Sequence, residues 1–290
     1  MSPGPSLSLC QLIDLALAED LGPGDVTSRL TVPPERLGRA QVRARRELVI
    51  SGLAVFEAVF ARVDPQVEVR LLAQEGELLA PGQVAVEIAG PAISLLAGER
   101  VGLNFLIRLS GVATWTRQFV QAVGPVGPTI LDTRKTTPGW RALEKAAVTH
   151  GGGRNHRFGL FDGIMIKDNH IAAVGSLEEA VRQAKRGAPM GLKVEVEVDS
   201  LGQIEPALRA GADILLLDNM SPQTLIEAVR LVESFFAPGP RRALLEASGG
   251  INLTTIEAVA KTGVDFISVG ALTHSAPAVD LGLDWRPEGD

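Results

Sequence analysis

Short apolar runs alternate with helix-patterned segments along the second part of the chain. Each run is rich in valine, isoleucine or leucine and ends abruptly in a charged residue or in glycine. The six runs cover residues 129–132, 163–166, 192–198, 213–217, 243–245 and 265–269. Short apolar strands alternating with helices predict a parallel sheet covered by helices. Because six strands are fewer than the eight of a complete barrel, we expect an incomplete barrel or one or two hidden strands.

Helical periodicity fills the gaps between these runs. Four of the helical segments begin at serine or asparagine, whose side chains accept the first N–H groups of a helix. The expected helices cover residues 137–149, 176–186, 200–210, 221–236 and 252–261, with N-caps at Ser176, Ser200, Ser221 and Asn252.

The first part of the chain has a different pattern. Apolar and polar residues alternate with period two, as in half-buried strands, and glycine and proline separate the segments. We expect strands at 41–50, 67–72 and 83–88, and helices at 9–20, 52–62 and 94–122. This pattern predicts a smaller α+β domain over residues 1–111 and the barrel over residues 112–274.

Composition narrows the class of protein. With 290 residues, 46% of them hydrophobic and 21% charged, the chain matches a soluble globular protein. A net charge of −6 argues against nucleic acid or an anionic membrane as the main partner. The single cysteine, Cys10, excludes an internal disulfide, fits a reducing compartment and is expected to pack as a small hydrophobe. Without a membrane-spanning or signal-peptide pattern, the expected location is cytoplasmic.

The ends of the apolar runs are the expected positions of chemistry, because the strand ends of a barrel share one rim. In the run 192–198, alternation places Lys193, Glu195 and Glu197 on one face, toward the barrel interior. Buried charges are costly unless paired, so these residues either form a buried Lys–Glu network or present Glu197, nearest the rim, to a ligand. We favour a ligand for Glu197.

Asp218 ends the next run, one strand away from Glu197. It either caps the following helix or forms a carboxylate pair with Glu197. Such a pair would hold Mg²⁺ or the hydroxyl groups of a sugar.

Glycines end the last two runs. Ser248, Gly249 and Gly250 precede an expected helix, and Gly270 follows the final run. Main-chain N–H groups beside a helix N-terminus bind phosphate, and barrels commonly build phosphate sites at their last strands. A tight turn is the alternative reading of the glycine pair.

Cationic side chains provide the opposite charge. They are Arg100 in the smaller domain and Arg134, Lys135, His156, Arg157 and Lys167 in the barrel. Gathered on one rim, they would repel one another unless an anion compensated them, which predicts a substrate with more than one carboxylate or phosphate. His156 is expected to titrate near neutrality, unless it caps a helix or forms hydrogen bonds in the core.

Several segments, taken together, resemble the quinolinate phosphoribosyltransferase family, also called nicotinate-nucleotide pyrophosphorylase (carboxylating). The segments are 133–139, 151–157, 167–170, 193–197, 217–219, 246–251 and 268–274. The likeness extends to residues 19–28, 98–101 and Asn104, so it covers nearly the whole chain.

The resemblance implies transfer of the phosphoribosyl group of phosphoribosyl pyrophosphate to quinolinate. The products would be nicotinate mononucleotide for NAD synthesis, pyrophosphate and CO₂, with Mg²⁺ as cofactor. The implied fold is an N-terminal α/β sandwich beside an incomplete, TIM-like α/β barrel, with residues 275–290 returning to the smaller domain. A homodimer or larger homo-oligomer is also implied, in which Arg100 reaches the neighbouring subunit's site.

The same resemblance assigns roles to the candidate residues. Arg134, His156, Arg157, Lys167 and the neighbour's Arg100 would hold the quinolinate carboxylates. Lys135 would lie near the leaving pyrophosphate, whereas Glu197 and Asp218 would bind the ribose hydroxyls and Mg²⁺. Thr133 belongs to the substrate-binding set, and Ser248, Gly249, Gly250 and Gly270 would hold the 5-phosphate.

Three other functions remain open from the residues alone. A Schiff-base aldolase would use Lys135 or Lys167 as its nucleophile. A paralogue of the same family, of the kind associated with molybdenum-transport operons, would act on a different acid. A regulatory protein would bind a phosphorylated sugar without turning it over.

Overall fold

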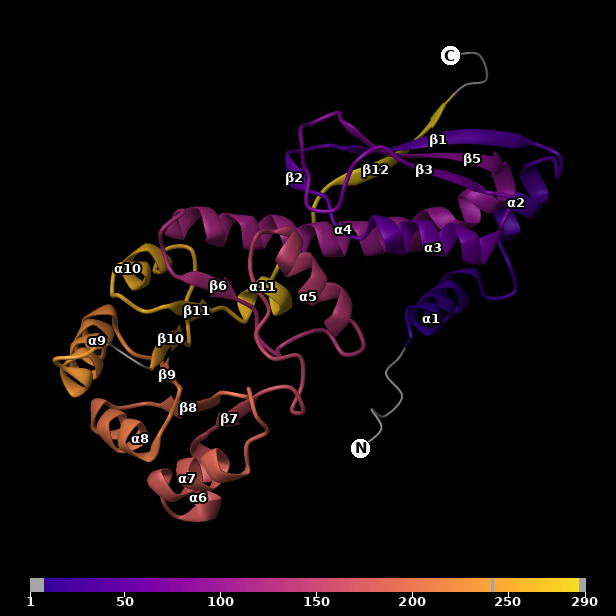
Figure 1. Ribbon diagram of the computed structural model, residues 1–290. Helices are drawn as coiled ribbons and strands as arrows, with labels where there is room; N and C mark the ends of the chain where they lie inside the picture. The colour runs from indigo at the N-terminus through magenta and orange to yellow at the C-terminus, as the bar shows by residue number, and fades with distance from the viewer. Residues whose placement is uncertain (1–7, 241–242, 287–290) are drawn as a thin grey trace. The chain divides into compact units, whose positions relative to one another are not determined.

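The computed structural model describes residues 8–240 and 243–286, which belong to two compact units. Among the described residues, the first unit contains 8–117, 137–152 and 276–286, and the second contains 118–136, 153–240 and 243–275. An antiparallel sheet is central to the first unit and a parallel sheet to the second, so the predicted fold class is confirmed (Figure 1). The domain boundary at Gly111 stays a prediction.

The parallel sheet has six strands in the order β6-β11-β10-β9-β8-β7. They are β6 (Thr129–Leu131), β7 (Ile164–Ile166), β8 (Val194–Val198), β9 (Ile214–Asp218), β10 (Leu244–Ser248) and β11 (Phe266–Ser268). Every strand overlaps one of the apolar runs, which confirms all six. At the free edge of β6, the Arg154 N–H donates to the Ile130 carbonyl (2.8 Å) and the Asp132 N–H donates to the Arg154 carbonyl (3.1 Å). This bridge adds a short parallel segment that the hydrophobic pattern did not reveal.

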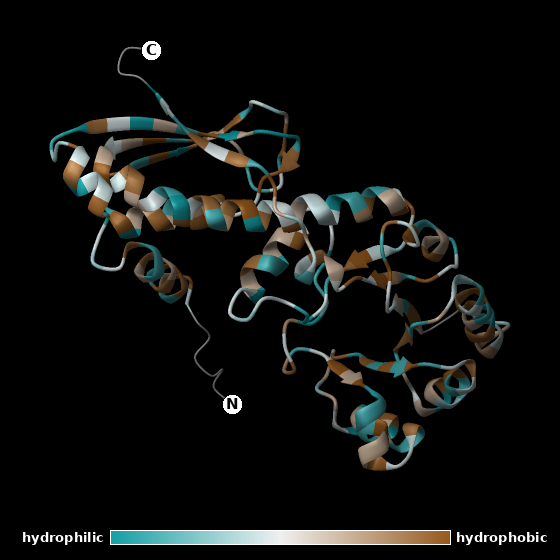
Figure 2. Ribbon diagram, turned by 180° about the vertical axis from the view of Figure 1, so that it is seen from behind, coloured by the Kyte–Doolittle hydropathy of each residue, from teal (hydrophilic) through white to brown (hydrophobic). Residues whose placement is uncertain are grey.

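Helices follow the strands of this curved sheet. They are α6 (Asp168–Val174), α7 (Leu177–Gly187), α8 (Ile204–Ala210), α9 (Pro222–Phe236), α10 (Ile256–Ala260) and α11 (Ala271–His274), with a 3₁₀ turn at Leu201–Gln203. Of these, α8, α9 and α10 lie along the outer side of the sheet (Figure 1). Figure 2 shows most of the strands in the brown of apolar residues. Val194, Val196 and Val198 of β8 are buried, as the alternation predicted.

Two of the four predicted N-caps are confirmed. The hydroxyl oxygens of Ser176 and Ser221 accept the N–H groups of the third residue of α7 and α9. Ser200 makes no side-chain capping bond before its 3₁₀ turn. The prediction that Asn252 caps a helix was wrong. Its side-chain oxygen accepts the Thr254 N–H (2.9 Å) in a local turn, and α10 begins only at Ile256.

The first unit has an antiparallel sheet in the order β12-β1-β5-β3 and a separate small pair of strands, β2 and β4. The strands are β1 (Leu37–Ala44), β2 (Leu48–Val49), β3 (Glu68–Leu71), β4 (Leu78–Leu79), β5 (Val84–Pro91) and β12 (Leu281–Arg286). The helices are α1 (Leu9–Leu21), α2 (Val26–Thr31), α3 (Leu53–Val63), α5 (Arg141–His150) and the part of α4 (Ala92–Val123) that ends at Arg117. The final strand pairs with the first, with Leu281 opposite Ala44.

One face of this sheet contributes Val42 and Ile88 to a core that also contains Phe56 and Phe60 of α3. Helix α4 continues through Gly111 without a break, and a Cβ at that position would lie 2.3 Å from the Pro277 carbonyl oxygen. The glycine therefore permits the close approach of the C-terminal segment. Cys10, by contrast, is exposed on α1, so the expectation that it packs in the interior was wrong.

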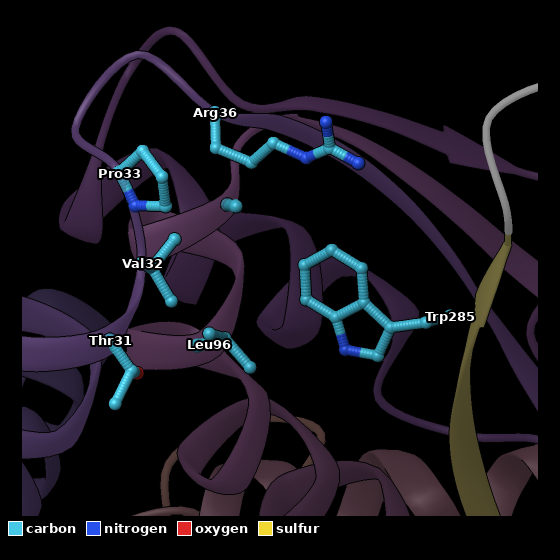
Figure 3. A pocket seen from close by; sticks show the side chains of 7 residues that line it. Thr31, Val32, Pro33, Arg36, Leu96 and Trp285 are labelled. Carbon is cyan, nitrogen blue, oxygen red and sulfur yellow. The ribbon is translucent and has the colours of Figure 1, made fainter.

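A shallow hollow of about 480 Å³ opens on the first unit (Figure 3). Its lining is Thr31, Val32, Pro33, Arg36, Ala92, Leu96 and Trp285. Arg36 is the one charged side chain in this lining, so the hollow has no group of acids and bases that could act together. The candidate chemistry lies in the second unit.

Candidate active site

A cavity of about 380 Å³, which we call the strand-end cavity, opens where the strands of the parallel sheet end. Each of the six strands contributes a lining residue at its carboxyl end or just after it. The predicted site residues in this lining are Thr133, Arg134, Lys135, His156, Arg157, Lys167, Glu197, Asp218, Ser248, Gly249 and Gly250. Parallel strand ends thus bring together residues that are widely separated in sequence.

Arg100 and Gly270 are not part of this lining. Arg100 is exposed on α4 in the first unit. Gly270 lies behind Lys135, since a Cβ on this glycine would be 3.1 Å from the Lys135 Cδ. The backbone of Lys135 is held from the same side, where the buried Thr273 hydroxyl donates to the Lys135 carbonyl (2.7 Å). Gly270 therefore leaves room for the lysine.

Acidic and basic residues touch one another in the cavity. The Lys167 ammonium at the end of β7 forms an ion pair with the Glu197 carboxylate of the neighbouring strand β8. On β9, Asp218 accepts a hydrogen bond from the Asn219 side-chain amide (2.7 Å) and lies opposite Ser248 of β10. Glu197 and Asp218 both line the cavity from the adjacent strands β8 and β9, and we call this part of the lining the carboxylate wall.

Arg157 and Arg134 form the cationic part of the wall. The Arg157 guanidinium donates to the Gly163 carbonyl (3.0 Å) and is partly buried. Burial and the positive charge of Arg134 both lower the pKa of Arg157. Two guanidinium groups close enough to repel each other form a site that an anion would stabilise.

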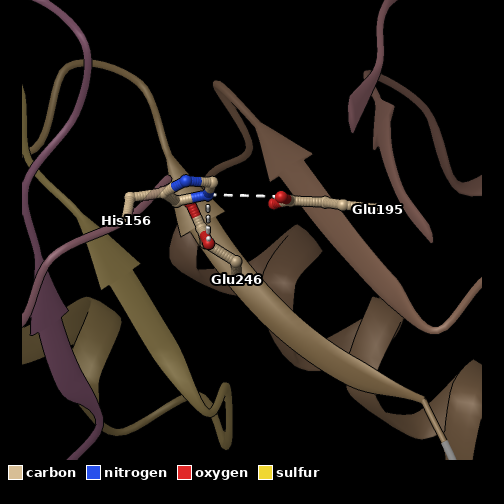
Figure 4. A group of neighbouring side chains, drawn as sticks. All are labelled: His156, Glu195 and Glu246. Atoms are coloured by element: carbon tan, nitrogen blue, oxygen red, sulfur yellow. Dashed lines mark ion pairs between the residues drawn. The ribbon is translucent and has the colours of Figure 1, made fainter. Parts of the chain in front are cut away.

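Within the lining of the cavity, His156 lies between two buried glutamates (Figure 4). Its Nε2 is 3.2 Å from Glu195 Oε2 and 3.5 Å from Glu246 Oε2. Burial lowers the pKa of His156, but the hydrogen bonds and charges of Glu195 and Glu246 outweigh it and raise the pKa to about 10. The expected titration near neutrality was therefore wrong, because the sequence did not show the two carboxylates around the ring.

The buried Lys–Glu network, which was the alternative to a ligand at Glu197, was wrong. Lys193 precedes β8 and is exposed, whereas Glu195 is 5% exposed and Glu246 2% exposed. The partner of Glu195 is His156, which comes from a segment 39 positions earlier in the chain. Alternation identified the inward face of the strand correctly but could not identify what lies opposite it.

The glycine turn after β10 is tightly packed. Gly249 and Gly250 have φ angles of 94° and 62°, and a Cβ at Gly249 would lie 2.2 Å from Asn219 Oδ1. Residues 251–255 form turns, so the helix N-terminus expected next to the glycines is absent from this described segment. Any phosphate held here would be bound by main-chain N–H groups and the Ser248 hydroxyl, without the dipole of a long helix.

Sequence reasoning missed three polar residues of the lining: Asn219, Glu246 and Ser268. Glu246 precedes Ser248 by two positions on β10 and therefore shares its inward face, a signal that alternation could have provided. The Ser268 hydroxyl donates to the Ser248 hydroxyl (3.0 Å). Asn219 adopts a φ of 55°, which only the structure reveals.

Residues 25–110 match the N-terminal domain of the quinolinate phosphoribosyl transferase family, and residues 112–284 match its C-terminal domain. The chain belongs to this family. A probable nicotinate-nucleotide pyrophosphorylase (carboxylating) of Bacillus subtilis is 44% identical over 278 residues, which are 96% of this chain and 93% of that protein. The family resemblance is therefore confirmed over nearly the whole length.

Two further relatives agree. A chloroplastic nicotinate-nucleotide pyrophosphorylase of Arabidopsis thaliana is 38% identical, over 96% of this chain and 83% of that protein. The crystal structure of NadC from Streptococcus pyogenes superposes with a TM-score of 0.88 at 40% identity, covering 99% of this chain and all of that one. None of the helices in residues 8–240 and 243–286 is apolar over the length needed to cross a bilayer. The cytoplasmic location stays a prediction.

Proposed function

We propose that this chain catalyses the reaction of quinolinate with phosphoribosyl pyrophosphate, giving nicotinate mononucleotide, pyrophosphate and CO₂ in NAD biosynthesis. Membership of the quinolinate phosphoribosyltransferase family supports this activity. The observation that supports it most directly is the division of one cavity between guanidinium groups and carboxylates. A dianionic acid and a sugar whose anomeric carbon becomes positively charged need these opposite partners.

Quinolinate binds at the cationic wall. Its two carboxylates are held by Arg134, Arg157 and Lys167, and the mutual repulsion of the two guanidinium groups is relieved when the dianion enters. Lys167 exchanges its partner Glu197 for a substrate carboxylate. Arg100 of a second copy of the chain completes the site, which makes the active unit a homodimer.

Phosphoribosyl pyrophosphate binds along the carboxylate wall. Glu197 and Asp218 hold the ribose hydroxyls, and the Ser248–Gly250 turn holds the 5-phosphate through its main-chain N–H groups. Lys135 lies beside the leaving pyrophosphate. As the bond to pyrophosphate breaks, the carboxylates stabilise the positive charge that develops at the anomeric carbon.

The two carboxylates also fit Mg²⁺, because this ion is usually held by one or two protein carboxylates together with substrate phosphates. Glu197 and Asp218 supply oxygen donors on adjacent strands, both facing the cavity. Bound there, the ion would neutralise charge on the pyrophosphate. This chain's own residues orient the ribose and the quinolinate ring.

The ring nitrogen of quinolinate attacks the anomeric carbon, and it needs no general base because it bears no proton. The resulting cationic ring accepts the electron pair left when the neighbouring carboxylate departs as CO₂. Arg134 and Arg157 keep that carboxylate oriented until the ring has become cationic. After CO₂ has left, the ring carbon that carried it takes up a proton. A proton donor of ordinary strength is sufficient for this step, and no dedicated catalytic acid is required.

An assay of ¹⁴CO₂ release from quinolinate labelled at the carboxyl group beside the ring nitrogen tests the proposal. We expect release only when phosphoribosyl pyrophosphate is present, in equal amount to the nucleotide formed. Binding of phosphoribosyl pyrophosphate without turnover of quinolinate would instead support the regulatory protein. Trapping of a borohydride-stable adduct on Lys135 or Lys167 would support the aldolase, and turnover of another acid would support the paralogue.

A further inference from the structure

Both ring nitrogens of His156 are engaged inside the protein, although the ring lines the strand-end cavity. Nδ1 accepts the main-chain N–H of Arg157 at 2.7 Å. Nε2 faces the Oε2 atoms of Glu195 and Glu246. Both nitrogens therefore have partners within the protein, through which His156 can influence the site.

The hydrogen bond from Arg157 determines which nitrogen carries the ring proton. An N–H group donates only to a lone pair, and Nδ1 has one only when its own proton is absent. The proton therefore sits on Nε2 and is donated to the two carboxylates. The pKa of His156, raised to about 10, means that the cluster holds one more proton at neutral pH. The bond at Nδ1 leaves that proton on the Nε2 side of the ring, where Glu195 and Glu246 lie.

This arrangement also bears on metal binding. The ligand atoms of His156, Glu195 and Glu246 lie within 4.8 Å of one another, a spacing that suits a metal ion. A metal on Nε2 would need the lone pair of that nitrogen, and the ring proton would then move to Nδ1. That proton would point at the Arg157 N–H. The contact with Arg157 therefore favours a proton over a metal ion in this cluster.

The two glutamates reach the ring from different strands. Glu195 belongs to β8 and Glu246 to β10, and β9 lies between these strands in the sheet. Both carboxyl groups are buried, and each keeps its Oε1 atom without a hydrogen-bond partner in the described structure. A buried carboxyl oxygen without a hydrogen bond lowers the stability of the folded protein. An arrangement that retains two such oxygens therefore indicates a role other than stabilising the fold.

We propose that Glu195 and Glu246 are positioning residues, which fix the His156 ring so that its Nδ1 holds the backbone of Arg157 and thereby orients the guanidinium toward quinolinate. The proposal rests on the proposed function, in which Arg157 binds a quinolinate carboxylate. The far end of Arg157 is fixed separately by the Gly163 carbonyl (3.0 Å). The side chain is therefore held at its backbone and at its guanidinium.

A mutant cycle tests the coupling. Glu246→Gln and His156→Asn should each raise the KM for quinolinate roughly tenfold, because a small displacement of a binding group weakens substrate binding strongly. The KM for phosphoribosyl pyrophosphate should stay within about twofold of the parent value. The double variant should match His156→Asn alone, because the glutamate acts only through the ring. Glu233→Gln on the exposed face of α9 is the matched control and should change neither constant.

Additive effects in the double variant would overturn the proposal, and so would equal losses for the two substrates. If Glu246→Gln does not fold, the same cycle is run with Glu195→Gln. A parent enzyme without quinolinate turnover would contradict the proposed function, whereas an active parent with additive variants would contradict this inference alone.

Nitrogen-15 spectra of histidine-labelled enzyme provide an independent measurement. The chain has four histidines, so His156 is assigned by the signal lost in His156→Asn. At neutral pH we expect a protonated Nε2 and an unprotonated Nδ1. An imidazolium with both nitrogens protonated would show that Nδ1 does not accept the Arg157 N–H, and the proposal would fail.

Discussion

Lys167 and Glu197 form an ion pair across the neighbouring strands β7 and β8, in the cavity where we place both substrates. Each residue has a different proposed partner in the reaction: a quinolinate carboxylate for the lysine and the ribose for the glutamate. The proposed roles therefore place the pair at the boundary between the two substrate positions and require it to separate when the substrates bind.

This division of roles gives opposite kinetic effects for the two walls. Glu197→Ala or Asp218→Ala should lower kcat roughly a hundredfold, because these groups stabilise charge that develops only in the transition state. Lys167→Ala or Arg157→Ala should chiefly raise the KM for quinolinate, since an ionic hydrogen bond contributes about 1.5–3 kcal/mol. Steady-state kinetics with each substrate varied in turn make the comparison. Similar changes in kcat and KM for both sets would contradict the assignment.

The glycine turn is expected to be intolerant of a side chain. Gly249→Ala places a Cβ 2.2 Å from Asn219 Oδ1 at a φ of 94°, so we expect a loss of about 1–3 kcal/mol in unfolding free energy. The KM for phosphoribosyl pyrophosphate should rise as the phosphate site is displaced. Gly187→Ala is the control, because a Cβ there has no atom within 4 Å. An unchanged KM in Gly249→Ala would argue against a phosphate at this turn.

Stability should depend on pH through His156. Its pKa is raised to about 10 in the folded protein, above the ordinary 6.5. The stabilisation is therefore complete below pH 6.5 and is lost as the pH rises through about 10. The groups bonded to the ring are Glu195 and Glu246 at Nε2 and the main-chain N–H of Arg157 at Nδ1, whereas Asp132 accepts the main-chain N–H of His156 (2.8 Å).

Urea unfolding at pH 7 and pH 10 measures this effect. The free energy of unfolding should fall more steeply over that interval in the parent than in His156→Asn, in which the cluster of His156, Glu195 and Glu246 that holds the extra proton is broken. Parallel curves for the two proteins would show that the ring cluster does not bind the extra proton.

A site shared between subunits predicts complementation. Arg100→Ala and Lys135→Ala should each be inactive alone, but a mixed dimer would contain one site with both residues intact. Mixing equal amounts after unfolding and refolding should restore about a quarter of the parent activity, because half of the dimers are mixed and each has one complete site. Verified subunit exchange without recovery would place Arg100 outside the neighbouring site.

Local sequence patterns predicted the parts of the second unit well. Runs of valine, isoleucine and leucine become the strands β6 to β11, because a strand buried on both sides needs apolar side chains in succession. Residues such as Glu197 and Asp218 interrupt that composition at the strand ends, and the common direction of parallel strands gathers them on one rim. The strands and the residues at their ends therefore follow from the order of neighbouring residues along the chain.

Predictions that needed a partner from elsewhere in the chain were less successful. Lys193 was expected to pair with the glutamates, but it stands one position before β8 and remains in solvent. Asn252 was expected to cap a helix, but its side chain closes a turn instead. In both cases the local residue type was compatible with two arrangements, and contacts with residues distant in the sequence decided between them.

By itself the amino-acid sequence determined the six parallel strands, the inward face of β8, the family and most of the polar residues at the strand ends. Only the tertiary structure decided that His156 lies between Glu195 and Glu246 and that Lys167 pairs with Glu197. Strand formation depends on the composition of a few consecutive residues, whereas the protonation and pairing of a buried group depend on charges supplied by other strands through space.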